Sequence, residues 1–80
     1  MNIHGLTMEI DLHGLTLDEA RAELQRCLKS CPKDITEIEV IHGYTNGSVL
    51  KNFVRRQFKH PRVSKKIITT NNGMTTFLLK

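Results

Sequence analysis

The stretch MEIDLHGLTLDEA (residues 8–20) decides the fold, because it holds a strand, a turn and a helix start in immediate succession. Apolar and polar side chains alternate from Met8 to Leu12, which is the period-two pattern of a half-buried strand. Gly14 then interrupts the strand. Thr16 and Glu19 have the spacing of a capping box, in which hydroxyl and carboxylate satisfy backbone N–H groups at a helix start. The stretch therefore predicts a strand that leads directly into a helix.

The helix is expected from about Leu17 to Ser30, since its apolar face continues that far and Pro32 follows. TEIEVIH (residues 36–42) alternates again and then becomes apolar on both faces, which indicates a second strand at the centre of the sheet.

Apolar residues recur at three- and four-residue intervals in residues 49–58, with basic residues between them. This spacing predicts a basic amphipathic helix that Pro61 stops. VSKKIITT (residues 63–70) and MTTFLLK (residues 74–80) are expected to be strands joined by a hairpin turn at Asn71-Asn72-Gly73.

The element order β-α-β-α-β-β places the chain in the α/β class as a two-layer α+β sandwich. We expect a four-stranded mixed sheet with both helices on one face. A right-handed crossover makes the first two strands parallel, and the last two form an antiparallel hairpin. The other face of the sheet would stay open to a ligand or partner.

A chain of 80 residues is expected to form one domain, with a core over about 8–80 and an N-terminal extension over 1–7. No apolar run approaches the roughly 20 residues that cross a membrane, and no signal peptide is evident, so we expect a cytoplasmic protein. Cys27 and Cys31 share the apolar helix face, which favours core packing over a metal site.

Charge divides the chain into two unlike halves. Residues 1–39 hold all eight carboxylates and four basic residues, a net charge of −4, whereas residues 40–80 hold eight Lys and Arg and no acid, a net charge of +8. Clustered cations attract polyanions and gain affinity by counterion release. The second half therefore indicates a nucleic-acid partner, with a solvated basic face as the alternative.

Two of the three His-Gly pairs follow strands that should be parallel. His13-Gly14 and His42-Gly43 fall at the carboxyl ends of these strands, where ligands collect in open α/β sheets. We interpret His4-Gly5, which precedes the first strand, as a chance repetition of the motif without a function. Asp11 has the strand parity of His13, so both should project away from the core. The pair has two interpretations. It is either a functional pair that acts in acid/base chemistry or binds phosphate, or a hydrogen-bonded pair that stabilises the turn.

The loop from His42 to Ser48 has two readings. Its glycines can turn backbone N–H groups toward an anion at the start of the basic helix, where Lys51 follows. Alternatively, it is a helix-entry turn with Ser48 as the cap. It is neither a Walker A loop nor a dinucleotide-binding loop, since neither glycine pattern is present.

The sequences IDLHG (residues 10–14) and IHG (residues 41–43), with the capping box, Gly47 and the basic helix, closely resemble the Smr (small MutS-related) domain. The resemblance implies the two-layer fold, similar to the C-terminal domain of bacterial translation initiation factor three. It also implies binding of DNA or structured RNA, with endonuclease or nicking activity in some members. Thr45 stands where the family commonly has its second loop glycine.

The resulting site predictions fall into two groups. Asp11, His13 and His42 are the candidate catalytic residues of an endonuclease. The candidate phosphate-binding residues are Gly14, Gly43, Tyr44, Thr45, Asn46, Gly47, Ser48, Lys51, Arg55, Arg56, Lys65 and Lys66. No metal site or cofactor is evident, although Asp11 and a phosphate oxygen could hold Mg²⁺ if the protein cleaves nucleic acid.

Binding of nucleic acid requires fewer features of the sequence than cleavage does, so we rank binding first. The other alternative is a non-catalytic adaptor that contacts proteins or the ribosome. Such a module could dimerise through an open sheet face bearing Ile41 and either Phe77 or Leu79. We expect a monomer, with the dimer as the alternative.

Overall fold

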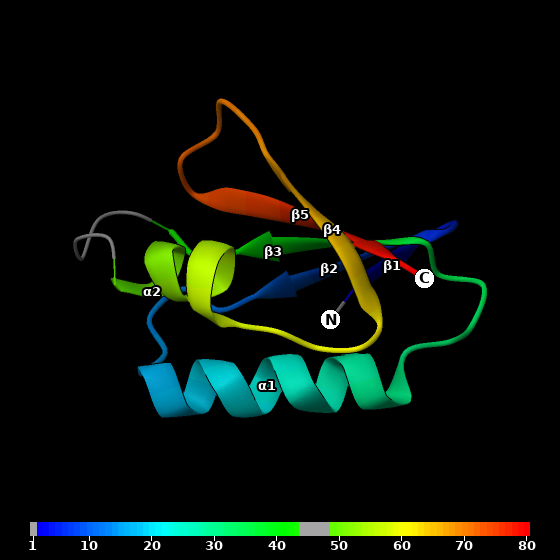
Figure 1. Cartoon of the computed structure of the whole chain (residues 1–80), viewed down its shortest axis with the longest axis horizontal. Coiled ribbons are helices and arrows are strands. Elements are labelled where there is room, and N and C mark those ends of the chain that lie inside the picture. The colour runs from blue at the N-terminus through cyan, green and yellow to red at the C-terminus, as the bar shows by residue number, and fades with distance from the viewer. Residues whose placement is uncertain (1, 44–48) are drawn as a thin grey trace.

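A computed structural model describes residues 2–43 and 49–80 (Figure 1). The elements run in the order β1 (Asn2–His4), β2 (Thr7–Asp11), α1 (Leu17–Ser30), β3 (Glu37–Ile41), α2 (Val49–Asn52), the π-helical segment η1 (Phe53–Gln57), β4 (Val63–Ile68) and β5 (Met74–Leu79). In Figure 1, α1 runs along one side of the sheet. No helix among the described residues is long and apolar enough to cross a bilayer.

The strands form one mixed sheet in the order β1-β2-β3-β5-β4. β2 and β3 are parallel neighbours, with Asp11 opposite Ile41, and β5 is antiparallel to both β3 and β4. The predicted central strand, the parallel pair and the terminal hairpin are therefore confirmed. They bring the carboxyl ends of β2 and β3 to the same edge of the sheet.

The start of α1 is fixed by its predicted capping box. The Thr16 hydroxyl accepts from the backbone N–H of Glu19 at 3.2 Å, and the Glu19 carboxylate accepts from the backbone N–H of Thr16 at 3.0 Å. This reciprocal pair satisfies two N–H groups that the helix leaves without an internal partner. The helix bounds agree with the prediction from the sequence.

Both helices pack on one face of the sheet, where they share a single core. The sulfur of Cys31 lies 3.4 Å from that of Met8, and burial raises the pKa of the Cys27 thiol, so both cysteines behave as core hydrophobes, as predicted. The buried apolar residues are Met8, Ile10, Leu12, Ala20, Leu24, Cys27, Leu28, Cys31, Ile35, Ile38, Val40, Phe53, Val54, Phe58 and Phe77.

The second helix differs from a regular amphipathic helix. After the single turn of α2, the backbone widens into η1, and the N–H of Phe58 donates to the carbonyl of Phe53 at 2.8 Å. This i to i+5 bond is the mark of a π-turn. Phe53 and Phe58 are both buried, with ring centroids 5.9 Å apart, so the wide turn places both rings in the core.

Two other predictions about the sheet need correction. The residues before β2 add an edge strand, because Gly5 turns β1 back onto β2 with a φ of +63°. Phe77 and Leu79 do not lie on the open face: Phe77 is fully buried and Leu79 packs against the core. Since side chains alternate along β5, it is Leu78, paired with Glu37, that shares the open face with Ile41.

Candidate nucleic-acid interface

The two His-Gly pairs meet at the carboxyl ends of β2 and β3. The backbone N–H of Leu12 donates to the carbonyl of Ile41 at 2.7 Å, which holds the two segments together past the last residue of β2. Gly14 and Gly43 both have positive φ angles, +84° and +71°. A Cβ atom added to Gly43 would lie 3.0 Å from Cδ2 of His13, so the His13 ring packs directly on the backbone of Gly43.

Asp11 holds the turn after β2 through the backbone and not through the imidazole. Its Oδ1 accepts from the backbone N–H of His13 at 2.9 Å. Of the two readings of this pair, the structure therefore contains the turn-stabilising bond. Both side chains project away from the core, as predicted, although only Asp11 belongs to β2 and His13 lies in the turn. Both side chains are exposed.

His42 is buried, with 3% of its surface exposed, and both ring nitrogens are bonded. Nδ1 lies 3.0 Å from the carbonyl oxygen of Gly43, which can only accept, so Nδ1 carries the proton. Nε2 lies 2.9 Å from the Thr75 hydroxyl, which itself accepts from Nε of Arg55 at 2.7 Å. The hydroxyl therefore donates to Nε2, and one directed chain runs from Arg55 to Gly43.

The pKa of His42 is lowered from its ordinary value. Burial is the main cause, and the positive charges of Arg55 and Lys51 lower the pKa further, although the bond to Gly43 opposes them. The imidazole is accordingly neutral at physiological pH, as its hydrogen-bond chain requires.

The turn between β4 and β5 supports the second His-Gly pair. The carbonyl of Gly73 accepts from the backbone N–H groups of His42 at 2.9 Å and of Gly43 at 3.0 Å. Arg55 also donates to the carbonyls of Asn71, at 3.2 Å, and Met74, at 3.0 Å. The Arg55 guanidinium is thus engaged with the fold and braces the turn whose Gly73 carbonyl binds the N–H of Gly43.

Thr75 was not singled out in the sequence, and Gly73 was named only as part of the hairpin turn, although both residues complete this arrangement. Thr75 is fully buried and occupies a core-facing position two residues before Phe77. A hydroxyl at an inward strand position was the available signal, since a buried hydroxyl needs a partner.

The predicted basic residues divide into two groups. Lys51 and Arg55 lie near enough to His42 to lower its pKa, and Arg56 is exposed on η1. Lys66 pairs with Phe77, which pairs with Ile38, four residues before His42 along the chain. This separates Lys66, and its neighbour Lys65, from the edge by about 13 Å of strand.

Lys66 is also engaged elsewhere. Its ammonium donates to the carbonyl of Phe58 and lies 5.5 Å from the centre of the Phe77 ring. Burial and then the charge of Lys59 lower its pKa. The structure thus brings together Asp11, His13, Gly14, His42, Gly43, Lys51 and Arg55, but not Lys65 and Lys66.

The remaining predicted residues, Tyr44, Thr45, Asn46, Gly47 and Ser48, lie outside the described residues. Within residues 2–43 and 49–80, no group of three or more His, Cys, Asp or Glu could hold a metal ion.

Comparison with known proteins gives matches to a family model and to solved structures. The model of the Smr domain family matches residues 10–75, which include both His-Gly pairs at the sheet edge. The crystal structure of the Smr domain of Thermus thermophilus MutS2 is similar, with a TM-score of 0.76 and 26% identity over 91% of this chain and 98% of that one. No curated protein gave a match.

Proposed function

Because the chain belongs to the Smr domain family, we propose that it binds nucleic acid at the edge where His13 packs on Gly43. The observation that carries the proposal is this contact, which gathers an exposed imidazole and two left-handed glycine turns at the end of the parallel strands. Glycine lets a backbone come close to a ligand, and an imidazole can donate to a phosphate oxygen.

The charged residues on the two sides of this edge indicate on which side a phosphate backbone binds. The first turn of α1 carries Asp18 and Glu19, and the capping box occupies the N–H groups of Thr16 and Glu19. That side of the edge therefore disfavours an anion. Lys51 and Arg56 lie in α2 and η1, in the half of the chain that lacks carboxylates. We therefore propose that the strand of nucleic acid lies over Gly43 on the α2 side.

The test is the affinity of the pure protein for a duplex DNA and for a structured RNA as a function of salt. Each phosphate contact adds about 0.9 to the slope of log affinity against log salt, so the slope should be steep. Lys51→Gln should lower this slope by about one. The matched control is Arg26→Gln, which removes an exposed charge from α1 beside Glu23. An affinity that does not change with salt would contradict the proposal.

Cleavage is the second candidate, and the exposed positions of Asp11 and His13 favour it. A proton-transferring group must reach the phosphodiester, which His13 can do from the surface. His42 is bonded inside the protein on both ring nitrogens, so in this scheme it positions Gly43. Asp11 together with a phosphate oxygen would supply the ligands for Mg²⁺.

Incubation with supercoiled plasmid and with structured RNA, in Mg²⁺ or in EDTA, separates the two candidates. Nicking that His13→Ala abolishes, while binding persists, would establish an endonuclease. Comparison of the Mg²⁺ and EDTA lanes would show whether the nicking depends on metal. Nucleic acid that is retarded but intact in every lane would leave a binding protein.

A further inference from the structure

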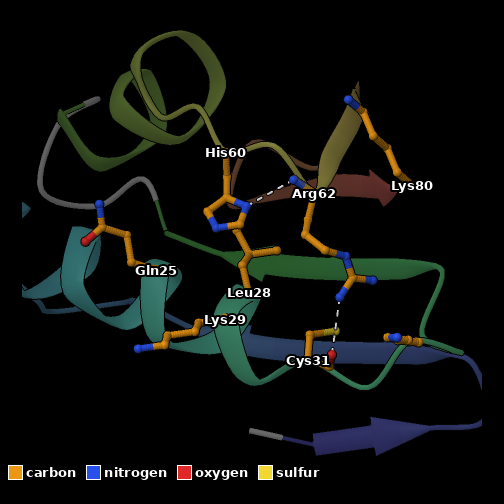
Figure 2. A pocket seen from close by; sticks show the side chains of 8 residues that line it. Gln25, Leu28, Lys29, Cys31, His60, Arg62 and Lys80 are labelled. Atoms are coloured by element: carbon orange, nitrogen blue, oxygen red, sulfur yellow. Dashed lines mark hydrogen bonds between the residues drawn. The ribbon is translucent and has the colours of Figure 1, made fainter.

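A basic groove of about 810 Å³ lies at the other end of α1 from the two His-Gly pairs (Figure 2). Its cations come from three separate parts of the chain: Lys29 in the last turn of α1 with Lys33 in the segment that follows, Arg62 before β4, and Lys80 after β5. Among the described residues that line it, none has a carboxylate side chain. The groove therefore has the charge of an anion site.

His60 adds an oriented donor to this groove. Its Nδ1 accepts from the backbone N–H of Arg62 at 3.0 Å, so the proton of the neutral ring is on Nε2. The ring is stacked on Phe58, with centroids 6.5 Å apart and an interplanar angle of 12°. Figure 2 shows the ring above Leu28, between the segment that precedes β4 and the last turns of α1. The donor is thus held in place before any ligand arrives.

The C-terminal end of a helix is partly negative, which would ordinarily repel an anion. Here Arg62 donates to the carbonyl of Cys31, immediately after α1, at 3.2 Å. This bond offsets the negative end of the helix with a guanidinium charge.

A stripe on α1 connects the groove with the proposed nucleic-acid edge. Arg21, Gln25 and Lys29 are spaced four residues apart, so they lie on one face of the helix. Arg21 lies over the ring of Phe53, 5.3 Å from its centre, and Gln25 lines the groove itself. The row thus carries cations near both ends of α1.

We infer that this groove is a second phosphate-binding site, which holds the backbone of the same nucleic acid that binds at the His13–Gly43 edge. The inference rests on the proposed function. The 14 residues of α1 span about 21 Å, which corresponds to about six steps of 3.4 Å along a strand. One nucleic acid that passes from the α2 side of the edge to the face of α1 that bears Arg21, Gln25 and Lys29 can occupy both sites, since Arg21 lies over Phe53 of η1.

The test compares two double variants of equal charge on a duplex of about 16 base pairs, long enough to cover both sites at 3.4 Å a step. Lys29→Gln with Lys33→Gln removes two exposed lysines of the groove. Arg26→Gln with Lys59→Gln removes two exposed cations that do not line it. The groove variant should bind about tenfold more weakly, with a salt slope smaller by about two, and the control should bind nearly as the wild type.

The outcomes separate this inference from the function on which it rests. A wild type that binds, with a groove variant of unchanged affinity, would overturn the groove alone. Equal weakening in both double variants would overturn it too, because only net charge would then matter. A wild type without affinity for nucleic acid would overturn both proposals.

The ring signals of His60 give a direct second measurement in the unmodified protein. They should shift in an NMR titration with the duplex. A shift with polyglutamate and none with the duplex would assign the groove to an acidic protein and contradict the inference.

Discussion

The ring of His13 packs on the backbone of Gly43, at a position where a Cβ would come within 3.0 Å of the imidazole. The contact joins the ends of two neighbouring parallel strands. Position 43 requires glycine for two separate reasons. Its φ is +71°, and the His13 ring occupies the space that a Cβ would need.

Gly43→Ala should lower the free energy of unfolding by about 2–3 kcal/mol, since a left-handed non-glycine residue costs roughly 1–2 kcal/mol and the ring must also move. Chemical unfolding measures the change. Gly5→Ala is the matched control, because Gly5 has a similar φ of +63° and no atom within 4 Å of an added Cβ.

Gly43→Ala should lower the free energy of unfolding by more than Gly5→Ala does. This excess should disappear when Gly43→Ala is made in a protein that also carries His13→Ala. If the excess survives in the double variant, the His13 contact is not its cause.

Thr75→Val should destabilise the protein by about 1–3 kcal/mol, because it keeps the shape but removes the hydroxyl that links Arg55 to His42. Thr76→Val is the control, since its side chain alternates to the open face of the sheet. Thermal unfolding of the two variants checks the prediction. Equal melting temperatures would show that the chain of bonds contributes nothing to stability.

Stability should fall as the pH decreases below about 6.5, the ordinary pKa of histidine. Burial lowers the pKa of His42 in the folded state, so the unfolded chain binds more protons between the lowered value and the ordinary one. The contribution is complete above the ordinary pKa and is lost as the pH falls toward the folded one. Urea unfolding at several pH values above 5 measures it.

His42→Gln should flatten this pH dependence. A variant with the same slope as the wild type would assign the effect to another group.

Local signals account for what could be predicted from the sequence. The capping box of Thr16 and Glu19 is complete within four residues, and it fixed the start of α1 correctly. The stretch of residues 36–42, which alternates and then becomes apolar on both faces, likewise identified β3 as central. The family motifs located both His-Gly pairs, whose meeting follows from two parallel strands that end at one edge.

Tertiary contacts account for the rest. The π-turn of η1 arises because both Phe53 and Phe58 pack in the core. The three- and four-residue spacing of an α-helix does not predict this pair, whose members are five residues apart. Arg55 was predicted to bind phosphate from its place among basic residues, whereas its donors reach Thr75 and the turn before β5. The basic groove combines residues from α1, the segment before β4 and the residue after β5, so no single stretch of sequence indicates it.

The central claim is that nucleic acid binds where His13 meets Gly43. An NMR titration of the protein with a short DNA duplex or a structured RNA, followed through the backbone amides and the histidine rings, tests it most directly. The account predicts the largest shifts at the His13 ring and at the amides of Gly14 and Gly43. Shifts confined to Glu39, Thr76 and the rest of the open sheet face, with Gly43 unchanged, would contradict it.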